Sequence, residues 1–184
     1  MLYFYNNNLH YIFDMPIVSN NTLRKLLKRD PPLVQGLLDI DVQVQPCGID
    51  LTVKTVASFD TAGTINFNNE RRIISSTTTL PFNESKMIDL PAGSYLITYN
   101  ESVHIPNNLI ALGFPRSSLL RCGVDVHTAL WDAGYSGRSQ SMLTVNNPHG
   151  FILHQNARVL QLIFISLDES VHEGYNGIFQ RENI

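Results

Sequence analysis

Residues 142–154 have the sequence MLTVNNPHGFILH, in which two short apolar stretches flank a polar segment. The stretches at 142–145 and 151–153 are rich in the aliphatic and β-branched residues that favour strands. The segment NNPHG at 146–150 is typical of a turn, because Asn and Gly accept positive φ and Pro fixes φ. We therefore predict two strands separated by a turn at this point of the chain.

The same pattern of short apolar segments and turn residues is found in the rest of the chain from about Asp41 onward. Turn residues separate short apolar segments at intervals of roughly 8 to 12 residues, a pattern expected of a β-sandwich or β-barrel. The sequence has no internal repeat and no long helical periodicity, so a doubly wound α/β domain is not expected. We predict an all-β fold. The further strand segments are 42–46 (VQVQP), 49–56 (IDLTVKTV), 94–99 (SYLITY), 109–114 (LIALGF) and 159–167 (VLQLIFISL).

One short N-terminal helix is expected before the strands. The residues NNT at 20–22 can cap a helix that continues through LRKLLKR, and the two prolines at 31–32 end it. Leu23, Leu26 and Leu27 share one face of this helix and are predicted to pack on the core.

Composition and charge argue against several classes of partner. The net charge is −3, so no basic field suggests a nucleic-acid partner. No stretch approaches the roughly 18 apolar residues of a membrane span. Residues 1–14 carry three consecutive Asn and lack the basic start and cleavage site of a signal peptide. We expect a cytoplasmic protein.

The cysteines and histidines do not form a metal-binding pattern. Cys47 and Cys122 lie far apart and form no Cys-x-x-Cys unit, so they are predicted to be small buried side chains in a reducing compartment. The six histidines are scattered and lack the His-x-Glu and Pro-Cys-x-x-Cys signature of zinc deaminases. Zinc chemistry is therefore not expected.

The segment PRSSLLRCG at 115–123 combines two guanidinium groups with two hydroxyls directly after a predicted strand. Arg116 and Arg121 offer planar forks of donors, and Ser117 and Ser118 add hydroxyls, a set suited to phosphate oxygens. If the segment opens a helical turn, free backbone N–H groups add to the anion site. The residues alone leave two interpretations open, a phosphate site or serines that cap a short helix.

Three further polar residues stand out against their surroundings. Asp132 lies in WDAGYSG at 131–137, where it either presents a carboxylate to activate a water or forms an Asx-turn. Gln161 interrupts the apolar strand segment at 157–164, so it either ties the core together or faces a ligand. Asp50 lies two residues after Gly48 at the start of a strand, a weak signal by itself that a turn-capping Asp would also explain.

Taken in order, these segments resemble the motifs of the dUTPase and dCTP deaminase superfamily, most closely its archaeal-type dUTPases in the deaminase-like branch. The resemblance extends over about residues 15–180. The residues that carry it are VQPCGIDLTV at 44–53, GFPRSSLLRCGV at 113–124, ALWDAGYSGRSQSMLTV at 129–145, ARVLQLIF at 157–164 and YNGIFQ at 175–180.

The resemblance implies a distorted β-barrel or jelly roll that assembles as a homotrimer, with active sites where subunits meet. Residues 15–184 are expected to form this domain. Residues 1–14 have no counterpart in the family and are expected to be an N-terminal extension.

The resemblance also implies roles for individual residues. Asp132 directs water at the α-phosphorus of dUTP, which gives dUMP and pyrophosphate. Mg²⁺ binds the triphosphate, with Asp50 as a candidate contact through a water. The phosphate-binding residues are Arg116, Ser117, Ser118, Arg121 and Gln161. The nucleoside-binding residues are Tyr135, Gln140, Ser141, Met142, Tyr175 and Gln180.

One position separates the two activities of the superfamily. The zinc-free deaminases carry a Glu five residues beyond the glycine that corresponds to Gly137, and this chain has Met142 there. Because methionine cannot move a proton, the sequence favours dUTP hydrolysis. Two alternatives stay open, a zinc-free dCTP deaminase with a rearranged base and a non-catalytic nucleotide-binding regulator.

Overall fold

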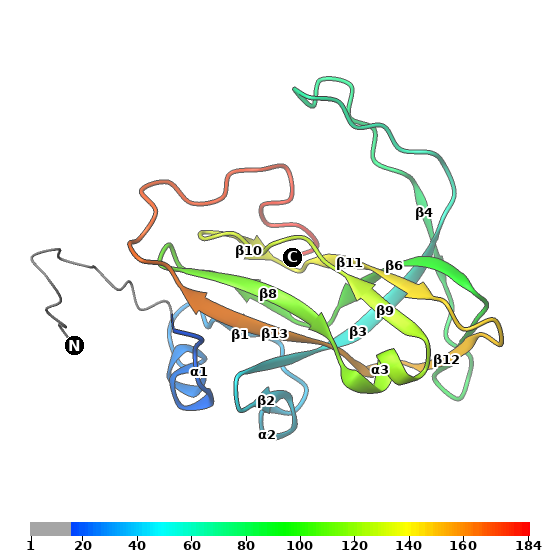
Figure 1. The fold of residues 1–184 in the computed structure, drawn as a ribbon, viewed down its shortest axis with the longest axis horizontal. Helices are drawn as coiled ribbons and strands as arrows, with labels where there is room; N and C mark the ends of the chain where they lie inside the picture. Colours follow the sequence, from blue (N-terminus) through cyan, green and yellow to red (C-terminus); the bar gives the residue numbers. More distant parts are fainter. Residues whose placement is uncertain (1–15) are drawn as a thin grey trace, which may run out of the picture.

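The computed structural model describes residues 16–184, which are organised around one large antiparallel sheet (Figure 1). Six strands lie in the order β8-β13-β3-β6-β11-β9, and two short strands, β2 (Val44–Gln45) and β4 (Thr77–Leu80), pair with β3. The six strands are β3 (Gly48–Phe59), β6 (Gly93–Tyr99), β8 (Leu109–Pro115), β9 (Val124–His127), β11 (Gln140–Val145) and β13 (Arg158–Ser166).

Two smaller antiparallel sheets complete the β structure. One has the order β1-β7-β10, with β1 (Val34–Gln35), β7 (Ser102–His104) and β10 (Ser136–Gly137). The other pairs β5 (Met87–Leu90) with β12 (Phe151–His154). The architecture confirms the predicted all-β class.

The core forms because most strands alternate buried and exposed residues. In β11, Ser141, Leu143 and Val145 are buried, whereas Gln140 and Met142 are exposed, as expected when successive side chains point to opposite faces. Strand β3 differs, because residues 49–53 are all buried and the strand is covered on both faces. Hence β3 is the centre of the sheet that positions the site.

The stretch 142–154 forms two strands as predicted, but they belong to different sheets. Strand β11 pairs with β6 and β9, and β12 pairs with β5. Between them Gly150 has φ +80°, which a residue with a side chain rarely adopts. The turn therefore works as a crossover between sheets.

Three short helices accompany the strands in the described part of the chain. A first helix forms as predicted, α1 (Asn20–Leu26), in which Leu23 is fully buried. Its bounds differ from the prediction, because residues 20–22 are its first turn and not its cap, Ser19 occupies the N-cap without a side-chain bond, and the helix ends three residues earlier than expected. Helix α2 (Ile40–Gln43) replaces part of the strand predicted at 42–46, because the Asp39 carboxylate accepts hydrogen bonds from the first helical N–H groups. Helix α3 (Ser117–Arg121) follows β8.

Both Cys47 and Cys122 are exposed free thiols, so the prediction that they are buried was wrong. Each lies in a short connection and not inside a strand. Among the described residues no helix is long and apolar enough to cross a membrane. The expected extension at residues 1–14 lies outside the described residues.

Candidate functional site

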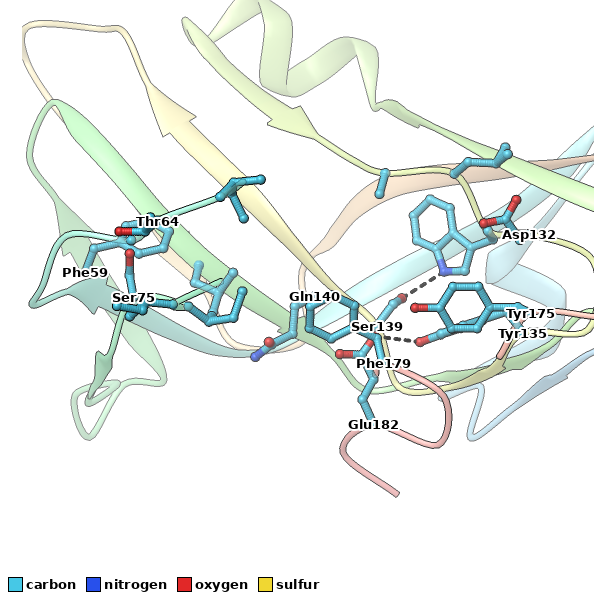
Figure 2. Close-up of a pocket in the computed structure, with 18 residues that line it drawn as sticks. Phe59, Thr64, Ser75, Asp132, Tyr135, Ser139, Gln140, Tyr175, Phe179 and Glu182 are labelled. Carbon is cyan, nitrogen blue, oxygen red and sulfur yellow. Dashed lines mark hydrogen bonds between the residues drawn. The ribbon is translucent and has the colours of Figure 1, made fainter. Parts of the chain in front are cut away.

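A cavity of about 560 Å³ lies between the loop that follows β9, the start of β11 and the C-terminal tail (Figure 2). A long connection between β3 and β4, residues 60–76, forms its other wall and projects from the body (Figure 1). The cavity is mainly apolar, which is typical of a small-molecule site. Its polar side chains include Asp132, Ser139, Gln140 and Glu182.

The loop 131–137 is held in place by backbone hydrogen bonds to β8 and to the residues just before it. Trp131 exchanges two backbone hydrogen bonds with Ala111, at 3.0 and 3.1 Å, and Ile105 N–H donates to the Tyr135 carbonyl at 2.8 Å. Gly134 has φ +83°, and a Cβ there would lie 2.5 Å from the Cα of Gly174. Glycine is therefore required where the tail crosses the loop.

Asp132 lines the cavity and is partly exposed. Its carboxylate makes no hydrogen bond to another described residue, so an Asx-turn does not account for it. The turn is closed instead by the backbone, since Tyr135 N–H donates to the Asp132 carbonyl at 3.1 Å. The structure thus leaves the Asp132 carboxylate available to a ligand.

Tyr135 lies beneath the tail and is almost fully buried. Its hydroxyl donates to Glu182 Oε1 at 2.8 Å, and its ring meets the Tyr175 ring edge-on, with centroids 5.8 Å apart. Burial and the Glu182 carboxylate together raise the pKa of Tyr135. Burial also raises the pKa of Glu182, although the Tyr135 hydrogen bond opposes that rise.

The tail is bound to the loop mainly through Gln180. Its amide oxygen accepts from Ser136 N–H at 2.8 Å, and its amide nitrogen donates to the Gly134 and Tyr175 carbonyls. These three bonds occupy the Gln180 amide, and Gln180 does not line the cavity. Tyr175 does line it.

The predicted nucleoside residues of β11 divide between the two faces of the strand. Gln140 lines the cavity, where its amide donates to Thr98 Oγ1 at 2.9 Å. Ser141 is buried on the other face and accepts from the Tyr99 hydroxyl at 2.8 Å, so only its backbone could contact a ligand. Met142 is exposed on the Gln140 face but does not line the cavity.

The predicted phosphate segment forms α3 and its N-terminal flank. The helix has Arg116 at its N-cap and no side-chain capping bond, so the alternative that Ser117 and Ser118 cap the helix is not observed. Both serines are exposed. Arg121 Nη1 donates to the Ser117 carbonyl at 3.1 Å.

Asp50 is 2% exposed and lies between two guanidinium groups. Arg116 Nε is 3.0 Å and Arg158 Nη1 is 3.1 Å from the same oxygen, Oδ2. Burial raises the pKa of Asp50, and the attraction of Arg116 and Arg158 opposes that rise. Gln161 is the cross-strand partner of Asp50, and its amide makes no hydrogen bond to another described residue.

The structure therefore brings the predicted residues together in two groups and not one. None of Arg116, Ser117, Ser118, Arg121 and Gln161 lines the cavity that contains Asp132. The groups are linked by β8, since Ala111 contacts Trp131 and Pro115 precedes Arg116. Roughly 13 Å of strand separates these two ends, and Figure 1 shows α3 at the far end of β8 from β10.

Several residues of these groups were not identified from the sequence. Glu182 and Phe179 line the cavity, and Arg158 shares Asp50 with Arg116. The connection 60–76 had no motif to mark it, although its exposed Ile65, Phe67 and Ile73 are unusual for a surface loop. Within residues 16–184, no group of three or more His, Cys, Asp or Glu is arranged to hold a metal ion.

The sequence matches the model of one known protein family. A family model described as dCTP deaminase-like matches residues 17–167, which is most of the chain. The chain belongs to the dCTP deaminase-like family. The resemblance inferred from the motifs is therefore confirmed.

Several curated relatives of this dCTP deaminase-like chain are named for dUTP hydrolysis. A protein of Methanosarcina mazei named "Probable deoxyuridine 5'-triphosphate nucleotidohydrolase" is 48% identical over 169 residues, 92% of this chain and 99% of that protein. A protein of the same name from Archaeoglobus fulgidus is 39% identical over 170 residues. The Methanocaldococcus jannaschii protein named "Deoxyuridine 5'-triphosphate nucleotidohydrolase" is 35% identical over 140 residues, 75% of this chain and 87% of that protein.

Among solved structures, the 2'-deoxycytidine 5'-triphosphate deaminase of Agrobacterium tumefaciens superposes with a TM-score of 0.63 at 22% identity. The match covers 83% of this chain and 48% of that chain. At this identity the likeness shows a shared fold, and a fold does not choose between hydrolysis and deamination.

Proposed function

We propose that this protein is a dUTP diphosphatase, which hydrolyses dUTP to dUMP and pyrophosphate. The observation that carries the proposal is the Asp132 carboxylate, which lines the cavity beside Tyr135 and is bonded to no other described residue. The names of the curated relatives support the same substrate. Asp132 would accept a proton from the water that attacks the α-phosphorus.

Deamination is the less favoured activity because strand β11 carries no Glu. Met142 stands where the resemblance implies the deaminase Glu, and an apolar thioether cannot activate water. Among the described residues, the carboxylates that line the cavity are Asp132 and Glu182. Glu182 Oε1 accepts the Tyr135 hydroxyl and so holds the tail on the loop, whereas the Asp132 carboxylate has no such bond to another described residue and is the better candidate for a general base.

Tyr135 is suited to exclude ribonucleotides. Glu182 fixes the Tyr135 hydroxyl, which also packs so closely against Gly137 that a Cβ there would lie only 2.7 Å away. A ring held this firmly cannot move aside for a ribose 2'-hydroxyl, which would also be buried without a partner. We therefore expect preference for the deoxyribose sugar.

The separation of the two groups supports an active site shared between copies of the chain. The phosphate residues near α3 and Asp132 lie at opposite ends of β8. A second copy that placed its α3 region beside this cavity would unite them, and a repeated head-to-tail contact forms a closed ring when the rotation between copies completes a circle. We accordingly infer the homotrimer that the resemblance implies.

Magnesium fits this site as an ion carried by the substrate. The described residues offer no cluster of acidic ligands, and Asp50 is committed to Arg116 and Arg158, which does not favour a water-mediated contact from Asp50. When bound to the triphosphate, Mg²⁺ would neutralise charge while it keeps several waters.

The exposed free thiols Cys47 and Cys122 fit a reducing compartment, so we retain the cytoplasm as the expected location.

The test is pyrophosphate release from dUTP, dCTP, UTP and dTTP with Mg²⁺ supplied. We expect release from dUTP, little from the others, and a loss of at least about 100-fold in Asp132→Asn. Asp168→Asn, which changes an exposed loop carboxylate, is the matched control. Ammonia release from dCTP would favour the deaminase, and dUTP binding without pyrophosphate release would favour the non-catalytic regulator.

A further inference from the structure

Two guanidinium groups meet at one buried carboxylate oxygen beside the predicted phosphate segment. We propose that Asp50 is a positioning residue that fixes Arg116 and Arg158 as a paired site for the distal phosphates of the nucleotide, and that Arg158 contacts those phosphates. The inference rests on the proposed function. It assigns a role to Arg158, which lies in the motif at 157–164 but was given no role by the resemblance.

The geometry leaves donors of both arginines free. Arg116 uses Nε for Asp50 and Nη1 for the Arg158 carbonyl, at 3.0 and 3.4 Å. Arg158 uses Nη1 for both Asp50 and the Val42 carbonyl. Since a guanidinium has five N–H donors, each arginine keeps about three that are not committed within the described residues. Their side chains are 31% and 30% exposed, so these donors can reach a ligand.

Like charges repel, so bringing two guanidinium groups to one point costs free energy unless a counter-charge offsets the repulsion. Asp50 supplies that charge, and its burial makes the attraction stronger than it would be at the surface. Together Asp50, Arg116 and Arg158, here called the triad, carry one net positive charge, which is the sign required to bind pyrophosphate oxygens. Because the arginines are held before the ligand arrives, less of the binding energy is spent in ordering them.

A second buried group holds the Asp50 backbone. The Gln43 amide donates to the Asp50 carbonyl at 2.9 Å and to Glu101 Oε1 at 2.7 Å. Glu101 is fully buried and also accepts from Thr52 N–H and from the Thr52 hydroxyl. The backbone from the Asp50 carbonyl to Thr52 is therefore tied into the core, so the carboxylate has little freedom to follow the arginines.

Gln161 lies on the next strand in register with Asp50. A Cβ on Gly48 would lie 3.1 Å from Gln161 Nε2, so the glycine leaves room for this amide. Gln161 is partly exposed and its amide has no partner among the described residues, so its N–H donors are available to a ligand. Its position beside the triad extends the proposed anion site across β3 and β13.

The experiment is isothermal titration of the full-length protein with inorganic pyrophosphate, in the wild type and in three variants. We expect Asp50→Asn to weaken pyrophosphate binding by about 10- to 100-fold, the range for hydrogen bonds to charged groups. Arg158→Met, which keeps the apolar stem, should weaken it by about 10-fold. The matched control is Asp41→Asn, whose carboxylate pairs with Arg24 at the surface and should change nothing.

A kinetic measurement separates positioning from general damage. In Asp50→Asn, KM for dUTP should rise while inhibition by dUMP stays within about twofold, because dUMP lacks the distal phosphates. Unchanged pyrophosphate affinity in a folded Asp50→Asn protein would overturn the proposal. Where that variant does not fold, unchanged affinity in Arg158→Met overturns it. A wild type that binds pyrophosphate but does not turn over dUTP refutes the proposed function and leaves the anion site intact.

Discussion

The Tyr135 hydroxyl donates to Glu182 Oε1 at 2.8 Å and thereby joins the cavity loop to the last residues of the chain (Figure 2). Backbone bonds reinforce the contact, because Arg138 N–H donates to the Glu182 carbonyl and Arg181 N–H donates to the Ser136 carbonyl. The tail thus forms an edge of the cavity, and it can move away only if these bonds and those of Gln180 break together.

The docking of the tail is expected to weaken as pH rises. Burial raises the pKa of Glu182 above its ordinary value of 4.5, so the docked tail favours the protonated carboxyl. This contribution is fully present below pH 4.5 and is lost as pH rises through the docked-state pKa. Trp131, the single tryptophan, lines the same cavity, so its fluorescence should change over that range.

The matched variants are Glu182→Gln, which should abolish the transition, and Glu173→Gln, which changes an exposed tail carboxylate and should leave it unaltered. An identical fluorescence transition in Glu182→Gln would show that another group is responsible.

Gly134 is expected to tolerate no side chain. Its φ of +83° is strained for other residues, and a Cβ would collide with Gly174. Gly36 has the same φ, but its nearest contact to a Cβ is 3.4 Å. Gly36→Ala should therefore cost about 1–2 kcal/mol of stability from backbone strain alone, and Gly134→Ala should cost more. Urea unfolding measures both, and equal losses would contradict the collision.

Acid is expected to destabilise the protein through His104. Burial, and then the charge of Arg29, lower the pKa of His104 below 6.5, so the folded protein favours the neutral ring. The ring Nδ1 is 2.7 Å from Ser136 Oγ, and Asn can present a polar atom at a similar place. The stabilisation is present above pH 6.5 and is lost as pH falls through the folded-state pKa. His104→Asn should therefore lose less stability than the wild type between pH 7 and 5, measured by urea unfolding.

The fold was largely predictable because local pattern determines it. The alternation in residues 140–145 and the turn residues at 146–150 act over a few positions, and the strands appear where the pattern placed them. The exceptions are also local. Asp39 caps α2 inside a segment that resembled a strand, and the exposed Cys47 and Cys122 show that a cysteine in a connection need not be buried.

The site was predictable in its parts but not in its contacts. Asp50 and Arg158 are 108 residues apart in sequence and meet only because β3 pairs with β13. The inward position of Ser141 follows from its alternation with Leu143, a signal that the sequence does contain. The distance between Asp132 and Arg116 could not be inferred from a motif, because motifs record order along the chain and not the separation of residues in space.

Two inactive variants are expected to restore each other if the site is shared between copies. Asp132→Asn damages the residues that line the cavity, and Arg116→Met damages the phosphate-binding residues near α3, so each variant should be inactive alone. In mixed trimers formed from equal amounts of the two variants, an active site needs intact cavity residues from one chain and intact phosphate-binding residues from its neighbour. Random assembly gives both with a probability of one half each, so about a quarter of wild-type activity should return. The control pairs Asp132→Asn with Tyr135→Ala, both in the same loop, which should restore nothing. Pyrophosphate release after joint refolding decides the matter, and activity no greater than the sum of the separate variants would place the whole site within one chain.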